Sequence, residues 1–221
     1  EDIQSAPYSF WPIIVALSRL IFILAPILCS SIEAMYRLLK IVSTILLLPS
    51  TVVSKAINIG ILSVANDGKG PVFIFIGFNS FLHNLTTTDA KSCLKCVINH
   101  LSPKGKFLIS IFVPDPEFLY RDANKLYPAT DFFQFENSQC RILETNDYDP
   151  GTQINKLTWY IEKNGKMDLK KYNYSMRMFY PHEMDILFQE EGFIIEDKFG
   201  NYDLCPLGQE RDMQIYICRK P

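Results

Sequence analysis

The sequence predicts an α/β fold with a partly parallel sheet, an antiparallel β insertion and an apolar, mainly helical N-terminal segment. Three observations lead to this prediction. An unbroken run of β-branched and aromatic residues, Val72 to Ile76, is typical of a strand buried on both faces. A helical pattern and a second apolar strand follow it, up to Val113. Polar and apolar residues then alternate over 131–180, as they do in strands with one face in water.

The composition suits one globular domain, or one domain with an appendage. The chain has 221 residues and a formal net charge of −2, which gives no reason to expect nucleic acid as a main partner. Its six cysteines are scattered, and Cys93 and Cys96 have no second pair to complete a zinc site. We therefore expect free thiols in a reducing, cytoplasmic compartment and no metal; a redox or metal role for this pair is the alternative. The sequence predicts no oligomeric state.

Composition divides the chain into an apolar segment, 1–70, and an α/β domain, 71–221. The first part contains two apolar runs, from Phe10 to Cys29 and from Ile41 to Leu62. Each is close to the roughly 20 residues that span a bilayer. Three interpretations stay open: two membrane-associated helices within residues 10–62, a helical part of the soluble domain buried against the sheet, or a segment not selected for this fold.

The start of the α/β domain is predicted to form a strand, a helix and a second strand. Gly77 ends the first strand, and a helix is expected over 87–101 with Thr87 or Thr88 as its N-cap. One face of this helix is apolar and carries Ala90, Cys93, Leu94, Val97, Ile98 and Leu101. The second strand, Lys106 to Val113, completes a right-handed crossover between parallel strands.

The polar turn after the first strand is the predicted ligand-binding position, because ligands of open α/β sheets bind at the carboxyl ends of the strands. Gly77, Phe78, Asn79 and Ser80 form this turn. His83 follows them and is the nearest candidate for a general base. Packing or capping at the start of the next helix is the alternative role for His83.

The rest of the chain is predicted to be an antiparallel meander followed by one helix and two strands. The turns Asp149-Pro150-Gly151 and Asn164-Gly165 separate the strands of the meander, and the second is a strong hairpin signal. Pro181 opens the helix, Gly192 stops it, and the last strand begins at Met213.

This order of elements resembles the class I S-adenosylmethionine-dependent methyltransferases of the small-molecule type. The segment FIFIGFNSFLHNLTTTDAKSCLKCVINHLSPKGKFLISIFVPDP is similar to the fourth strand, the following helix and the fifth strand of that family. The resemblance continues to the end and covers residues 71–219. It implies a partial Rossmann-like methyltransferase sheet whose last two strands form an antiparallel hairpin at one edge.

The resemblance also implies methyl transfer from S-adenosylmethionine to a small-molecule acceptor. Gly77, Phe78, Asn79 and Ser80 would then line the space for the cofactor and the acceptor, with His83 as the candidate base.

In the resembled family, an insertion at the place of 131–180 covers the active site. Tyr160, Arg177 and Tyr180 are therefore candidate substrate-binding residues, together with Arg141 and Trp159. Exposed strands carry arginine and tyrosine routinely, so a purely structural role is the alternative for each of them.

The cofactor cradle of the resembled family is not visible in this sequence. That cradle uses a glycine-rich turn after the first strand and an acidic residue at the end of the second. This chain has no glycine before Gly60, and Glu33 is the only acid between Asp2 and Asp67. We therefore expect cofactor binding to be weak or absent. The alternative function is a non-catalytic methyltransferase remnant or a partner-binding module, membrane-associated if residues 10–62 form an anchor.

Overall fold

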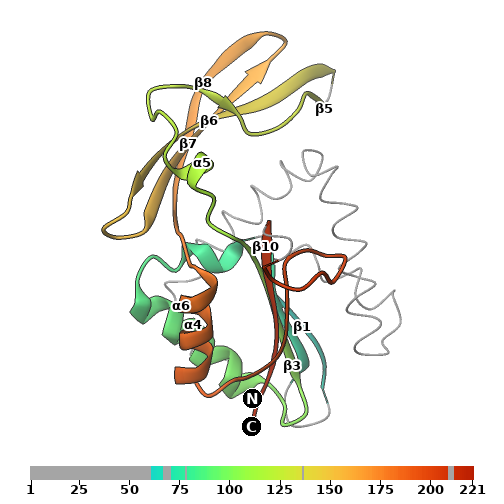
Figure 1. Ribbon diagram of the computed structural model, residues 1–221. Coiled ribbons are helices and arrows are strands. Elements are labelled where there is room, and N and C mark those ends of the chain that lie inside the picture. Colours follow the sequence, from blue (N-terminus) through green and yellow to red (C-terminus); the bar gives the residue numbers. More distant parts are fainter. Residues whose placement is uncertain (1–60, 67–70, 78, 136, 209–211) are drawn as a thin grey trace, which may run out of the picture.

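Two sheets, with helices packed on one of them, make up the structure (Figure 1). Predictions for residues 1–60, including the membrane-associated helices, fall outside the described residues, and so does the prediction for Phe78. Within the described part of the chain, no helix is long and apolar enough to cross a membrane. The computed structural model describes residues 61–66, 71–77, 79–135, 137–208 and 212–221.

The first sheet contains the predicted parallel pair. Among the described residues its strand order is β1-β2-β3-β10-β9, with β2 parallel to β3 and every other pair of neighbours antiparallel. The strand predicted at 72–76 is flanked on both sides, and the last two strands form the expected hairpin at one edge. The strands are β1 (Ile61–Asn66), β2 (Pro71–Ile76), β3 (Lys106–Phe112), β9 (Ile194–Phe199) and β10 (Met213–Arg219).

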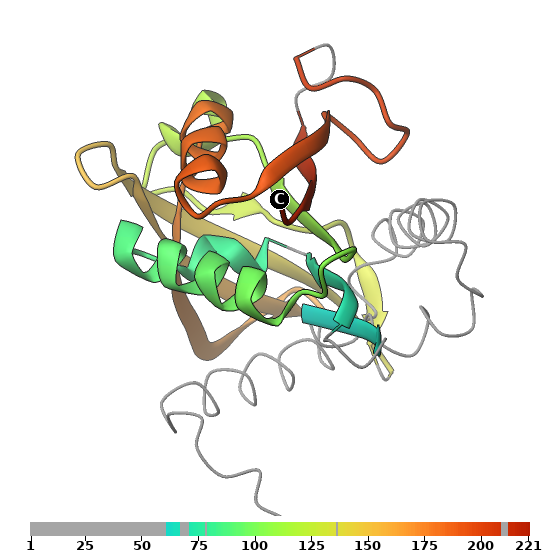
Figure 2. The same ribbon diagram turned by 90° about the horizontal axis from the view of Figure 1, so that it is seen from below.

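Helices α4 (Thr87–His100) and α6 (Pro181–Glu190) pack side by side on one face of this sheet (Figure 2). The N-cap of α4 is Thr86, not the predicted Thr87 or Thr88, because the Thr86 hydroxyl accepts a hydrogen bond from the Asp89 amide at 3.1 Å. Two shorter helices, η2 (Ser80–His83) and α5 (Pro116–Leu119), follow β2 and β3 respectively.

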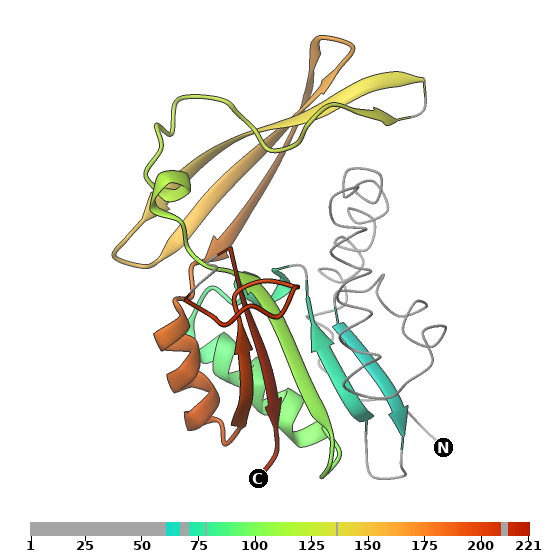
Figure 3. The ribbon, with the colours of Figure 1, turned by 45° about the vertical axis from the view of Figure 1, so that its right-hand side comes forward.

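The second sheet is the predicted antiparallel insertion, and it lies beyond the carboxyl ends of β2 and β3 (Figure 3). Asn164 and Gly165 join β7 to β8 with φ values of 49° and 76°, as a two-residue hairpin turn requires. The strand order is β4-β6-β7-β8, and β5 also pairs with β6. The strands are β4 (Tyr127–Pro128), β5 (Phe133–Phe135), β6 (Ser138–Asp149), β7 (Ile154–Lys163) and β8 (Lys166–Arg177).

Strand β1 extends the first sheet to residues before the expected domain boundary at 70. It pairs antiparallel with β2, Ile61 opposite Ile76 and Asn66 opposite Pro71. The end of the segment 1–70 that we expected to be mainly helical is therefore a strand. The carboxyl end of β1 lies beside the amino end of β2, away from the end of the sheet where β2 finishes.

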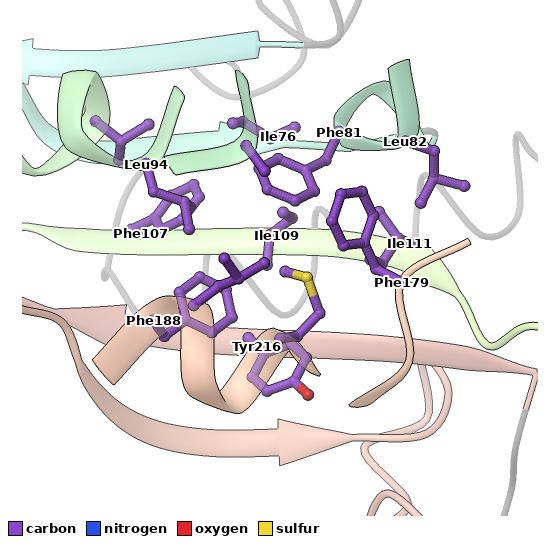
Figure 4. Close-up of a cluster of buried hydrophobic side chains, with 14 of the residues drawn as sticks. Ile76, Phe81, Leu82, Leu94, Phe107, Ile109, Ile111, Phe179, Phe188 and Tyr216 are labelled. Carbon is purple, nitrogen blue, oxygen red and sulfur yellow. The ribbon is translucent and has the colours of Figure 1, made fainter. Parts of the chain in front are cut away.

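The main core lies between the first sheet and its two helices (Figure 4). Phe107 of β3 packs against Phe188 of α6 and against Phe193, with ring centroids 6.2 Å and 5.4 Å apart. Phe188 also lies against Tyr216 of β10, at 4.9 Å. These aromatic side chains join the middle of the sheet to α6, so the core depends on residues far apart in the sequence.

Phe107→Ala should lower the free energy of unfolding by about 3–5 kcal/mol, because it leaves a cavity at a fully buried aromatic site. Urea unfolding followed by circular dichroism measures this change. Leu169→Ala is the control, since the Leu169 side chain is 98% exposed and its loss should cost less than about 0.5 kcal/mol. Equal stability of the two variants would contradict the central position of Phe107.

Candidate functional site

The turn after β2 is held by the side chain of Asn79. Asn79 has a left-handed backbone, with φ 60° and ψ 13°, a conformation that asparagine tolerates better than most residues. Its Oδ1 atom accepts a hydrogen bond from the Phe112 amide at 2.9 Å. The Ser80 amide donates to the Gly77 carbonyl at 3.0 Å. The turn therefore ties the carboxyl ends of β2 and β3 together at the predicted ligand-binding edge.

Gly77 has a packing role within this turn. A Cβ atom at Gly77 would lie 2.1 Å from Cζ of Phe75, the buried aromatic residue two positions earlier on the same side of the strand. Glycine is therefore required here by the ring of Phe75, whether or not a ligand also approaches the backbone.

His83 connects the first sheet to the insertion. Its Nδ1 atom lies 3.2 Å from the carbonyl oxygen of Ser175 on β8, and its ring lies 6.2 Å from that of Tyr174. A carbonyl only accepts, so this bond places the proton on Nδ1 and leaves Nε2 as an acceptor. The His83 side chain is exposed, but the protein atoms packed around part of its ring disfavour the charged form and lower the pKa of His83 below its ordinary value, although the Ser175 bond acts in the opposite sense.

A polar network that the sequence did not predict extends from this position into the insertion. Trp159 lies against Tyr174 at 5.0 Å, and its Nε1 donates to Glu144 at 2.8 Å. Glu144 also forms an ion pair with Arg121 at 2.8 Å, with both side chains largely buried. The signal in the sequence is that Glu144 and Asn146 stand at alternate positions of β6, on the same buried face as Cys140 and Ile142.

Asn155 is a further residue that sequence reasoning missed. It is fully buried, and neither polar atom of its side chain has a hydrogen-bond partner among the described residues. The strand register places it opposite Tyr148 and Met176, on the same face of the insertion as Leu157 and Trp159. Buried polar atoms without partners are uncommon in folded proteins.

The structure does not bring Tyr160 together with this network. Trp159 pairs with Glu144, whereas Tyr160 pairs with Leu143 and Lys171, so the two neighbours point to opposite faces of the second sheet. The Lys171 ammonium lies 5.2 Å from the Tyr160 ring. A substrate-binding role for Tyr160 stays a prediction, and its position is on the far face from His83.

Arg177 and Tyr180 lie where the insertion returns to the first sheet. Arg177 is 8% exposed; it donates to Thr87 Oγ1 at 2.9 Å, donates to Gln153 at 3.2 Å, and forms an ion pair with Glu183. These bonds use the two terminal nitrogens of the guanidinium, whereas its buried Nε atom has no hydrogen-bond partner among the described residues.

Tyr180 is 39% exposed and precedes α6 as its N-cap residue. Burial, with a hydrogen bond to Tyr180 as the next cause, raises the pKa of Tyr148 to about 12. The Tyr180 side chain thus lies beside Tyr148 of the insertion with part of its surface open to solvent.

The Cys93 and Cys96 pair does not resemble a reactive or metal-binding centre. Cys93 is half-buried and Cys96 is exposed. Burial raises the pKa of Cys93 to about 11, which keeps that thiol protonated at neutral pH. Among the described residues, no group of three or more His, Cys, Asp or Glu side chains is placed to hold a metal ion.

Solved structures with a similar fold include methyltransferases, one of them described as S-adenosylmethionine-dependent. The methyltransferase CcbJ from Streptomyces caelestis matches with a TM-score of 0.55 and 16% identity, over 71% of this chain and 60% of that one. A Clostridium acetobutylicum methyltransferase has a TM-score of 0.54 and 14% identity, over 71% and 61%. An amino pentose methyltransferase from Micromonospora echinaspora, solved with S-adenosylmethionine bound, has a TM-score of 0.50 and 12% identity, over 72% and 61%.

These matches establish the methyltransferase fold for the α/β part of the chain, as the sequence resemblance predicted. The chain spans about three fifths of the length of these structures, 60–61%. No family model matches the sequence, and no curated protein matches it either.

Replacing Asn79 should separate its two contributions to the turn. Asn79→Gly keeps the left-handed backbone but leaves the Phe112 amide without its acceptor, so we expect a loss of about 1–3 kcal/mol in unfolding free energy. Asn79→Ala should lose about 1 kcal/mol more, because alanine resists the left-handed conformation. Urea unfolding of both variants tests this order, and an alanine variant as stable as the glycine variant would contradict it.

NMR titration should give His83 a pKa below 6.5, its ordinary value. Because the folded state favours the neutral ring, the His83 contribution to stability is present above pH 6.5 and is lost as the pH falls through the folded pKa. His83→Gln assigns the resonance by removing it. A midpoint above the ordinary value would contradict the expected lowering of the His83 pKa.

Proposed function

We propose that this chain is an S-adenosylmethionine-dependent methyltransferase-like protein that acts on a small-molecule acceptor. The observation that supports this most is the methyltransferase fold, with the antiparallel insertion standing beyond the carboxyl ends of β2 and β3. Ligands of such sheets bind at that edge. The acceptor would lie between the turn at 77–80 and the inner face of the insertion.

The described residues suit the acceptor side of this reaction. When bound, S-adenosylmethionine supplies an electrophilic methyl group. His83 holds its Nδ1 proton against Ser175, so Nε2 is free to take a proton from an acceptor hydroxyl or ammonium. The lowered pKa keeps this imidazole neutral near pH 7. The Asn79 amide nitrogen and the Ser80 hydroxyl are proposed to orient the acceptor.

Tyr180, which is partly exposed beside Tyr148, is proposed as a further acceptor contact. Arg177 is proposed to act indirectly, because its bonds to Thr87 and Glu183 hold the base of the insertion in place.

The described residues fit the cofactor side of such a site less well. Gly77 is used in packing against Phe75, and Oδ1 of Asn79 is used by the Phe112 amide. β1 runs antiparallel to β2, so no turn follows it at the edge where β2 ends. The sequence also has no glycine before Gly60. Gly77, Phe78, Asn79 and Ser80 remain the proposed neighbours of the cofactor, but we assign no step of the reaction to a cofactor-binding residue.

A second candidate function follows from the direction of β1. An antiparallel strand beside β2 favours a non-catalytic methyltransferase remnant or a partner-binding module that lacks the cofactor cradle. For both candidates we propose a cytoplasmic location, with membrane association through residues 10–62 as the alternative.

Isothermal titration calorimetry of the full chain distinguishes the two candidates. The methyltransferase proposal expects heat from S-adenosylmethionine and from its demethylated product, S-adenosylhomocysteine, with saturation below millimolar concentration. Adenosine and methionine added separately are the controls for weak, non-specific heat. No heat at millimolar concentration of either ligand would exclude the enzyme and leave the remnant.

If methyl transfer to an amine or hydroxyl acceptor is detected, His83→Gln should reduce kcat by about 10²–10⁴-fold, the usual contribution of a general base. His100→Gln is the matched control, because His100 ends α4 and bonds within its own helix to the Cys96 carbonyl at 2.8 Å. Transfer of radioactive methyl groups measures both rates. Equal rates for the two variants would remove His83 from the mechanism.

A further inference from the structure

The first sheet has a second face that α4 and α6 do not cover. Side chains alternate along a strand, so Ile74 and Ile76 point to the helices while Phe73 and Phe75 point the other way. Figure 2 shows both helices on one side of the sheet. The second face consists of Phe73, Phe75, Leu108, Ile215 and Ile217, each between 0% and 3% exposed and none part of the core formed with the helices.

The loop after β9 reaches one end of this second face. The hydroxyl groups of Tyr202 and Ser110 lie 2.6 Å apart, and Ser110 pairs with Ile215 near the carboxyl end of β3. Phe73 pairs with Lys106 at the amino end of β3, so it lies at the other end of the face. A sheet with two apolar faces needs a packed layer on each of them.

We propose that the apolar segment 10–60 of the same chain packs on the second face and forms this layer. The segment leads directly into β1, which begins at Ile61 and pairs with β2, the strand that carries Phe73 and Phe75. Because the segment is joined covalently to β1, its effective concentration at the second face is high. From Phe10 to Cys29, Arg19 is the one charged residue.

The length of the segment suits this role. A helix of 20 residues is about 30 Å long. The strands of the sheet have six or seven residues, which corresponds to about 20–23 Å. One helix from the apolar run can therefore cover the second face along its strands. This inference concerns the architecture of the chain and does not depend on the proposed methyltransferase function.

Photo-crosslinking of the full chain tests the proposal. The photoreactive amino acid p-benzoylphenylalanine replaces Phe73 on the second face and, as the matched control, Phe107 on the helix face. Tyr202, at the rim of the second face, is an alternative position if the Phe73 variant does not fold. An equal mixture of unlabelled and ¹⁵N-labelled protein shows by mass spectrometry whether each crosslink joins one chain or two.

The proposal expects crosslinks from position 73 or 202 to peptides of residues 10–60 within one chain. The control at position 107 should crosslink to peptides around Phe188 and Phe193, which its ring contacts. Crosslinks from the second face to another copy, or to lipid or detergent, would overturn the proposal. A control that crosslinks normally while positions 73 and 202 never reach residues 10–60 would overturn it as well.

Discussion

The parallel pairing of β2 and β3 is the constraint on which the rest of the structure depends. A parallel pair cannot be closed by a hairpin, so the chain must cross over, and α4 is that crossover. The pairing also brings both carboxyl ends to one edge. The chain leaves that edge twice, through η2 after β2 and through α5 after β3, and the second exit leads into the insertion. The position of the candidate site therefore follows from the parallel direction of β2 and β3.

Buried charges then fix the insertion against this edge. Arg177 ends β8 and bonds to the first residue of α4 and to the first turn of α6, which places three elements around one guanidinium. Arg121 does the same beyond α5, between the rings of Phe118 and Tyr127 and the carboxylate of Glu144. A buried charge is costly without its partner, so any arrangement that separates such a pair is disfavoured. The pairs therefore specify how the insertion sits against the first sheet, and their net contribution to stability is small.

The sequence predicted the fold well because its signals are local. The apolar run of β2, the helical face of α4 and the Asn164-Gly165 turn each depend on neighbouring residues. The pairing of Arg121 with Glu144 spans 23 positions and the His83 bond to Ser175 spans 92, and no local pattern encodes such contacts. Asn79 and His83 follow the carboxyl end of β2, as the sequence predicted, and their role in a site stays a prediction, whereas Asn155 and the buried network were found only in the structure.

Strand β1 lies before the domain boundary that composition predicted at residue 70. The stretch Asn66-Asp67-Gly68-Lys69-Gly70 is a turn or linker signal, and composition alone does not show that the residues before it pair with β2. Residues 61–66 pair with β2 in the antiparallel direction, because the side of β2 away from β3 offers unpaired backbone groups to a further strand. Because β1 is antiparallel to β2, the amino end of β1 lies beside the carboxyl end of β2, where the candidate site is. In such folds a phosphate- or ribose-binding turn follows the carboxyl end of a strand. The carboxyl end of β1 lies at the opposite end of the sheet from the candidate site.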